Sequence, residues 1–144
     1  MDRCATMFYG VYEAATRRFT FVNAGHVAAL VVNVAGESID LDSSSRPIGL
    51  FDWETFAAQS VRLDPGSWLI IFSDGVSEAS NERDEEFGRG RLATLVRRCA
   101  DRSPAAMCEA IVRAVADHGE GRPAADDVTV AAAHLAPLTS QDRS

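Results

Sequence analysis

The sequence predicts an α+β fold built mainly from antiparallel β-sheet. Short apolar segments that alternate with polar residues fill the chain up to residue 73, and turn-forming residues separate them. Two segments with apolar residues at helical spacing follow between residues 92 and 118, and one more β-rich segment lies at residues 128–135. Many strands, then two helices, then one strand is the order of an α+β domain.

The first part of the chain is expected to supply a hairpin and three further strands. Residues 5–12 are rich in aromatic and β-branched side chains, and Phe19 and Phe21 alternate with polar neighbours within residues 18–23. A polar connection joins these two segments, so they are predicted to pair as an antiparallel hairpin. The further strands are expected at residues 27–34, around Ile39 and Leu41, and at residues 55–63.

A buried strand at residues 67–73 is the segment on which the functional interpretation depends. An Asp-Pro-Gly turn signal precedes it, and its large apolar residues end abruptly at Asp74 and Gly75. Asp-Gly is a common turn pair, so an ordinary turn is one interpretation. The other interpretation is that Asp74, fixed at the end of a rigid strand, serves as a metal ligand or as an acid–base group.

The two helices are predicted from apolar spacing and from a capping residue. The second helix is expected to begin with Ser103 as N-cap and Pro104 at its first position, and to end at His118. Both segments carry an apolar stripe at helical spacing, formed by Leu92, Leu95, Val96 and Cys99 in the first and by Met107, Ile111 and Val115 in the second. The polar and acidic residues 77–91 ahead of them are expected to form a loop with a single helical turn.

Composition excludes several classes of protein. The 144 residues suit one domain, and a net charge of -7 argues against non-specific nucleic-acid binding, which needs a basic surface. The three cysteines form no CxxC pair, so a disulfide scaffold is not expected and a reducing cytoplasm is the natural compartment. The start of the chain has no signal-peptide character, and the apolar run at residues 27–32 is too short to span a bilayer. A soluble, cytoplasmic protein is therefore expected.

A pair of adjacent aspartates later in the chain is a possible partner for Asp74. Asp126 and Asp127 lie just before the last predicted strand, and both helices lie between them and Asp74. If the last strand returns antiparallel beside residues 67–73, Asp74 and Asp126 meet at one edge of the sheet. Two carboxylates that close repel each other unless a cation lies between them, and oxygen ligands favour Mg²⁺ or Mn²⁺. The alternative is that both are solvated loop residues.

Six short segments occur in a distinctive order along the chain: Phe8-Tyr9-Gly10-Val11, Val22-Asn23-Ala24-Gly25-His26, Pro47-Ile48-Gly49-Leu50, Phe72-Ser73-Asp74-Gly75-Val76-Ser77-Glu78-Ala79, Phe87-Gly88 with Arg91-Leu92, and Asp126-Asp127-Val128-Thr129. In this order they resemble the catalytic domain of bacterial PPM-type (protein phosphatase 2C-like) serine/threonine phosphatases of the stage II sporulation protein E and RsbU kind. The likeness runs from about Thr6 to Leu135, nearly the whole chain.

The resemblance implies an antiparallel β-sandwich with flanking helices and two Mn²⁺ or Mg²⁺ ions at one edge of it. Asp74 and Asp126 match the family's metal-binding, catalytic aspartates, and Gly75 and Asp127 are expected to support them from adjacent positions. The implied reaction is hydrolysis of phosphoserine or phosphothreonine by a metal-activated water. The implied substrate is a small phosphorylated signalling protein such as an anti-anti-sigma factor.

One departure from the family pattern qualifies these expectations. The family has a further metal-binding Asp-Gly pair upstream of the first strand matched here, whereas in this sequence Asp2 is followed by Arg3. Residues 1–136 are therefore interpreted as a partial phosphatase domain whose N-terminal elements are missing, and residues 137–144 as a flexible tail. Two carboxylates predict weak metal binding, and the activity of the isolated chain stays open. A missing strand also leaves a sheet edge free for a homodimer.

Two other functions stay open beside the enzyme. One is a non-catalytic, phosphatase-like module that binds a regulatory partner, and the other is a plain α+β interaction domain. Three other features each have two interpretations. His26 forms a hydrogen-bonded turn after Asn23 or serves as a general acid, and Arg46 is a solvated residue or a phosphate ligand. The acidic run at residues 82–86 is a solvated loop or a site for a metal or a partner.

Overall fold

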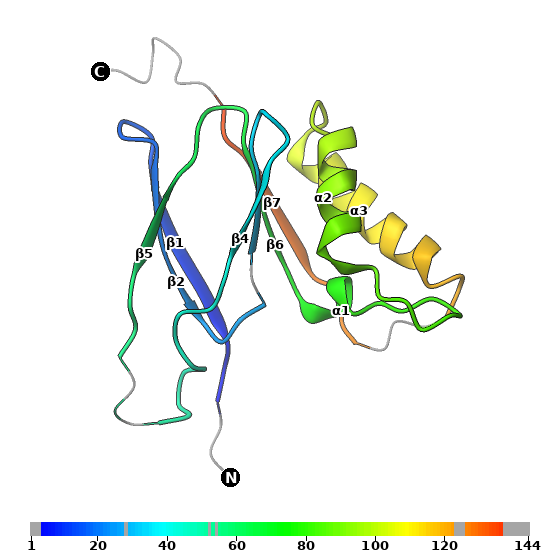
Figure 1. Ribbon diagram of the computed structural model, residues 1–144, viewed down its shortest axis with the longest axis horizontal. Helices are drawn as coiled ribbons and strands as arrows, with labels where there is room; N and C mark the ends of the chain where they lie inside the picture. Colours follow the sequence, from blue (N-terminus) through cyan, green and yellow to red (C-terminus); the bar gives the residue numbers. More distant parts are fainter. Residues whose placement is uncertain (1–3, 28, 52, 54, 123–125, 137–144) are drawn as a thin grey trace.

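The structure consists of two facing antiparallel sheets, with helices against the outer face of one of them (Figure 1). This computed structural model describes residues 4–27, 29–51, 53, 55–122 and 126–136. The predicted antiparallel sandwich with flanking helices is confirmed. The predicted tail at residues 137–144 and the departure at Asp2 lie outside the described residues.

A three-stranded sheet forms the first layer, in the order β1-β2-β5. Its strands are β1 (Met7–Glu13), β2 (Arg18–Ala24) and β5 (Gln59–Arg62). The predicted hairpin is present, because β1 and β2 pair antiparallel along their whole length, from Met7 with Ala24 to Glu13 with Arg18.

Strand β5 is shorter than the predicted strand at residues 55–63, and the reason lies in its neighbour β2. Pairing with β2 stops at Phe21 and Gln59. Beyond that point the carbonyl of Asn23 in β2 accepts hydrogen bonds from the backbone N–H groups of Ser44 and Ser45, each at 3.2 Å. The loop after β4 therefore occupies the edge of β2 along which a longer β5 would have paired.

The four-stranded second sheet has the order β4-β3-β6-β7. Its strands are β3 (Ala29–Val32), β4 (Ser38–Leu41), β6 (Trp68–Phe72) and β7 (Val130–His134). Strand β6, the predicted buried strand, lies inside this sheet between β3 and β7 and pairs antiparallel with both.

Strand β6 contributes to two separate apolar layers because successive side chains of a strand point to opposite faces. Trp68, Ile70 and Phe72 belong to the core that the sheet forms with the helices, whereas Leu69 and Ile71 belong to the core between the two sheets. In the layer between the sheets, the rings of Phe8, Phe19 and Phe21 stack on one another with centroids 5.6–6.3 Å apart.

Helices α2 (Gly88–Arg98) and α3 (Pro104–His118) cover the four-stranded sheet (Figure 1). The predicted cap is present, since the Ser103 hydroxyl accepts a hydrogen bond from the backbone N–H of Ala106 at 3.2 Å. Of the predicted stripe on the first helix, Leu92, Val96 and Cys99 are buried and Leu95 is half-buried. The buried residues of α3 are Met107, Ile111 and Val115.

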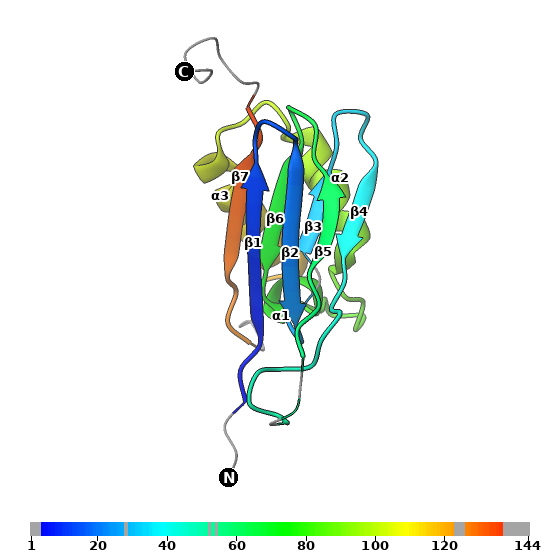
Figure 2. The same ribbon diagram turned by 90° about the vertical axis from the view of Figure 1, so that its left-hand side faces the viewer.

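The outer face of the three-stranded sheet carries exposed apolar side chains. Met7, Tyr9 and Val11 of β1 are 40%, 61% and 49% exposed. Figure 2 shows no described helix in front of β1. Within the described residues β1 pairs along its length with β2 alone. This is the free sheet edge that the sequence predicted, and the homodimer stays a prediction.

The position of β6 predicts a large difference between two isoleucines. Ile70 is fully buried between β3 and β7, so Ile70→Ala is expected to lower the free energy of unfolding by about 2–5 kcal/mol. Ile39 lies on the edge strand β4 and is 40% exposed, so Ile39→Ala is expected to cost less than about 1 kcal/mol. Urea denaturation measures both values, and equal losses would contradict the assignment of β6 as the central strand.

Candidate functional site

Asp74 begins a helical turn directly after strand β6. The strand ends at Phe72, Ser73 stays extended as the N-cap residue, and α1 (Asp74–Ser77) follows as a single turn that ends on Glu78. The ordinary turn that was one interpretation of the Asp-Gly pair is therefore not formed, and a helix starts there instead. The side chain of Val76 is fully buried in the core beneath the helices, which fixes this turn against the sheet.

Ser73 joins the end of β6 to the segment that precedes β7. Its backbone N–H donates to the carbonyl of Thr129 at 3.0 Å, and its hydroxyl donates to the carbonyl of Asp127 at 2.7 Å. The same hydroxyl accepts a hydrogen bond from the N–H of Thr129 at 3.0 Å. These three bonds continue the antiparallel pairing of Phe72 with Val130 and hold the residues after Asp126 beside Asp74.

Gly75 lies against the same segment. A Cβ atom at this position would come within 2.4 Å of the carbonyl oxygen of Asp127 and within 3.1 Å of that of Asp126. Because real Cβ atoms do not approach a carbonyl oxygen so closely, only glycine allows this contact without a shift of the backbone. The helical turn of Asp74 and the Asp126–Asp127 segment are therefore packed backbone to backbone.

The structure thus brings together the four residues that the sequence singled out at one end of the four-stranded sheet. One oxygen of Asp74 accepts a hydrogen bond from the N–H of Gly75 at 2.9 Å, and one oxygen of Asp126 accepts from the N–H of Asp127 at 2.7 Å. The convergence follows from antiparallel pairing of β6 and β7, as expected. The assignment of Asp74 and Asp126 as metal ligands stays a prediction.

We call the place where Asp74, Gly75, Asp126 and Asp127 meet the corner. Its donor atoms are of the kind that a divalent cation prefers, but there are few of them. Mg²⁺ and Mn²⁺ prefer oxygen ligands and complete their shells with several waters, so carboxylates are suitable donors. Across the part of the chain that the structure describes, no group of three or more His, Cys, Asp or Glu side chains is placed to hold one metal ion. Two aspartates with local hydrogen bonds are consistent with the weak metal binding predicted from the sequence.

Ser73 is a residue of this corner that the sequence analysis did not single out. A signal for it was present, because pairing of β6 with β7 places the residue after Phe72 opposite Thr129. A serine there can both donate and accept, which suits the unpaired carbonyl and N–H groups beyond the last ladder pair.

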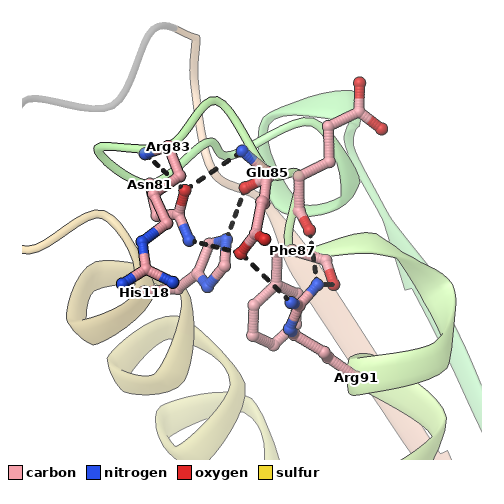
Figure 3. Close-up of polar contacts among 7 residues, drawn as sticks. Asn81, Arg83, Glu85, Phe87, Arg91 and His118 are labelled. Carbon is pink, nitrogen blue, oxygen red and sulfur yellow. Dashed lines mark hydrogen bonds and ion pairs between the residues drawn. The ribbon is translucent and has the colours of Figure 1, made fainter.

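The acidic loop that follows α1 has exposed side chains but a well-organised backbone (Figure 3). The side-chain oxygen of Asn81 accepts from the N–H groups of Arg83 and Glu85 at 2.9 and 3.0 Å.

The two helices also bind this loop. His118 at the end of α3 donates to the carbonyl of Glu85 at 2.8 Å. Arg91 of α2 donates to the carbonyls of Glu86 and Phe87. The predicted solvated loop is thus attached to both helices.

The segment containing His26 forms the hydrogen-bonded turn that the sequence predicted. The N–H of His26 donates to the side-chain oxygen of Asn23 at 2.9 Å, and the side-chain amide of the buried Asn23 donates to the carbonyl of Leu41 at 3.1 Å. Gly25 between them has a φ of 68°, a conformation that favours glycine.

Arg46 has a neighbourhood that the sequence analysis did not anticipate. Its guanidinium lies 4.9 Å from the ring centroid of Phe51 and 5.9 Å from that of Trp53. The two rings stack on each other at 4.9 Å. Arg46 is exposed, as the solvated interpretation expects, and it adds a cation–π contact with these rings. The role as a phosphate ligand stays a prediction.

Comparison with protein families identifies the class of protein to which this fold and this corner belong. The family model for Stage II sporulation protein E (SpoIIE) matches residues 1–136. The chain therefore belongs to the SpoIIE family, in agreement with the resemblance of its sequence motifs.

The relatives are longer proteins. The chain is 31% identical over 135 residues to Protein IcfG of Synechocystis sp. (strain ATCC 27184 / PCC 6803 / Kazusa), covering 93% of this chain and 21% of that protein. It is 33% identical over 73 residues to Phosphoserine phosphatase RsbP of Bacillus subtilis (strain 168), covering 51% of this chain and 18% of that protein. The chain thus spans about a fifth of the length of these relatives.

Solved structures share the fold. The SiaA-PP2C domain of Pseudomonas aeruginosa superposes with a TM-score of 0.67 at 26% identity, over 81% of this chain and 46% of that chain. The phosphatase domain of SpoIIE from Bacillus subtilis, presoaked with Mn, gives 0.69 at 18% identity, over 95% of this chain and 59% of that chain. Among the residues described, no helix is long and apolar enough to cross a membrane.

The contact at Gly75 predicts opposite effects for two glycine substitutions. Gly75→Ala forces a methyl group onto the carbonyl of Asp127 and is expected to lower the free energy of unfolding by about 1–3 kcal/mol. A Cβ added at Gly90 in α2 would meet no atom within 4 Å, so Gly90→Ala is expected to raise stability by up to about 1 kcal/mol. Urea denaturation compares the two, and a Gly75→Ala variant as stable as the parent chain would show that the two segments are not in contact.

Proposed function

We propose that this chain forms part of a PPM-type serine/threonine phosphatase that hydrolyses phosphoserine or phosphothreonine on a bacterial signalling protein. The observation that carries this proposal is the corner in which Ser73 and Gly75 hold the Asp126–Asp127 segment against the helical turn of Asp74. Two carboxylates fixed by backbone contacts at the end of a rigid strand are suited to hold a cation in a defined position.

The relatives support the same reaction. RsbP and RsbU of Bacillus subtilis, the latter 30% identical over 81 residues, are both named phosphoserine phosphatases. The phosphatase domain of SpoIIE was presoaked with Mn, the kind of ion that is proposed here. By the same family relation, the substrate proposed for this chain is a small phosphorylated regulator such as an anti-anti-sigma factor.

In this proposal Asp74 and Asp126 hold a Mn²⁺ or Mg²⁺ ion. Such an ion, when bound, polarises a phosphoryl oxygen and makes a coordinated water acidic enough to be a nucleophile. The chain's own contribution is positional: Ser73 fixes the carbonyl of Asp127, and the missing side chain of Gly75 lets the two segments close. Without a cation the two carboxylates repel a phosphate group, so phosphopeptide binding should depend on the metal.

A second function has a specific observation in its favour. Within the described residues no third acidic or histidine side chain joins Asp74 and Asp126 as a metal site. A chain with this ligand set can keep the fold and bind a regulatory partner without turning over substrate. The non-catalytic, phosphatase-like module is therefore the alternative that the experiment below must separate from the enzyme.

Manganese binding and hydrolysis of an aryl phosphate test the proposal together. Asp74→Asn and Asp126→Asn are each expected to weaken Mn²⁺ binding at least roughly tenfold, the smallest loss seen when even a residue that supports a metal ligand is removed. Asp101→Asn is the matched control, because Asp101 is exposed and follows Ala100, whose carbonyl accepts from Trp68 at the other end of β6. Calorimetry measures the affinity, and release of the aryl alcohol measures turnover.

The two readouts separate the functions. Turnover that requires Mn²⁺ and disappears in both site variants, but not in Asp101→Asn, supports the phosphatase. Mn²⁺ binding that both site variants weaken, without turnover in the parent chain, supports the non-catalytic module. Equal Mn²⁺ affinity in all four proteins would show that Asp74 and Asp126 do not form the metal site.

A further inference from the structure

A groove of about 550 Å³ opens beside the proposed phosphatase site. Its walls come from the turn before β3, the end of β4, the end of α1 and the start of α2, and they include His26, Asp42, Glu78 and Arg89. A volume of this size lies within the range of protein sites that take small ligands or a few side chains.

The groove is joined directly to Asp74. Glu78 in its wall donates its backbone N–H to the carbonyl of Asp74 at 2.8 Å, and the hydroxyl of Ser77, also in the wall, donates to the same carbonyl at 3.4 Å. Asp74 and Glu78 are thus separated by one helical turn, a rise of roughly 5–6 Å. An extended peptide advances about 3.3 Å per residue, so this distance corresponds to about two residues of a peptide.

Three carboxylates in the groove wall have no ion-pair partner among the described residues. Asp42, Glu78 and Glu86 line the groove, and within the described residues none of the three side chains makes an ion pair or a side-chain hydrogen bond. The guanidinium of Arg89, which also lines the groove, forms an ion pair with Asp40 at 3.1 Å and lies over the ring of Phe72.

We propose that this groove binds a lysine or arginine side chain that lies within a few residues of the phosphorylated residue of the substrate protein. The inference rests on the proposed function, because the phosphate has to be held at the Asp74 corner for its neighbours to reach the groove. Charge complementarity selects the occupant: three free carboxylates in a concave site attract a cation and disfavour an acidic segment. The groove thus contributes substrate selection separate from the chemistry at phosphorus.

The test measures binding of fluorescent phosphoserine peptides to the full chain in the presence of Mn²⁺. One peptide carries lysines on both sides of the phosphoserine, a second carries glutamines there, and a third has the lysines but no phosphate. Fluorescence anisotropy should show roughly fivefold tighter binding of the lysine phosphopeptide than of the glutamine phosphopeptide, since exposed charge pairs each contribute only a modest gain in affinity. The preference should shrink as salt is added.

Two double variants of equal charge locate the effect. Glu78→Gln with Glu86→Gln should remove most of the preference for lysine, whereas Glu109→Gln with Asp117→Asn should keep it, because these residues are exposed on α3. The side chains exchanged are isosteric and exposed, and circular dichroism verifies that both variants fold. Equal loss in the two variants, or no lysine preference in the parent chain, overturns the groove proposal.

Failure of the proposed function gives a different result. If phosphorylated and unphosphorylated lysine peptides bind equally, and Asp74→Asn changes neither, then the corner does not hold the phosphate. The groove proposal is judged by a different comparison, namely whether the Glu78→Gln and Glu86→Gln variant loses the preference for the lysine peptide over the glutamine peptide.

Discussion

The candidate site depends on the contact between Ser73 and residues 127–129. The chain leaves β6 at Phe72 and returns only after two helices, so nothing in the covalent structure keeps Asp74 near Asp126. The three hydrogen bonds of Ser73 supply that link, and Gly75 removes the side chain that would hold the segments apart. The contact lies directly after β6, whose residues are almost all buried, so the two aspartates are held at the end of a strand inside the sheet.

The rest of the fold supports the corner from three directions. The layer between the sheets fixes one face of β6, the helices fix the other, and the indole N–H of Trp68 donates to the carbonyl of Ala100 at its far end. Beyond α1, Asn81, Arg91 and His118 attach the acidic loop to the helices (Figure 3). The groove lies between this loop and the sheet, so its shape is tied to the same framework.

Much of this arrangement was predictable from the sequence, because strong local signals agree with the fold. The hairpin, the capped helix at Ser103 and the convergence of Asp74 with Asp126 follow from periodicity, capping chemistry and antiparallel pairing. Features set by contacts between distant segments were not predictable in this way. The early end of β5 depends on Asn23 bonding to the loop after β4, and the position of Arg46 depends on the rings of Phe51 and Trp53. The helical start at Asp74 likewise depends on the buried side chain of Val76 rather than on the turn preference of Asp-Gly.

The proposed function requires that Asp74 and Asp126 together bind one divalent cation. Titration of the isotope-labelled chain with Mn²⁺, followed by backbone amide NMR, tests this binding, because the paramagnetic ion broadens the signals of nearby amides whether or not the protein is active. The amides of residues 74–77 and 126–128 are expected to broaden together at the lowest Mn²⁺ concentrations. Earlier broadening in the acidic loop at residues 82–86, with the Asp74 and Asp126 amides unaffected, would contradict it.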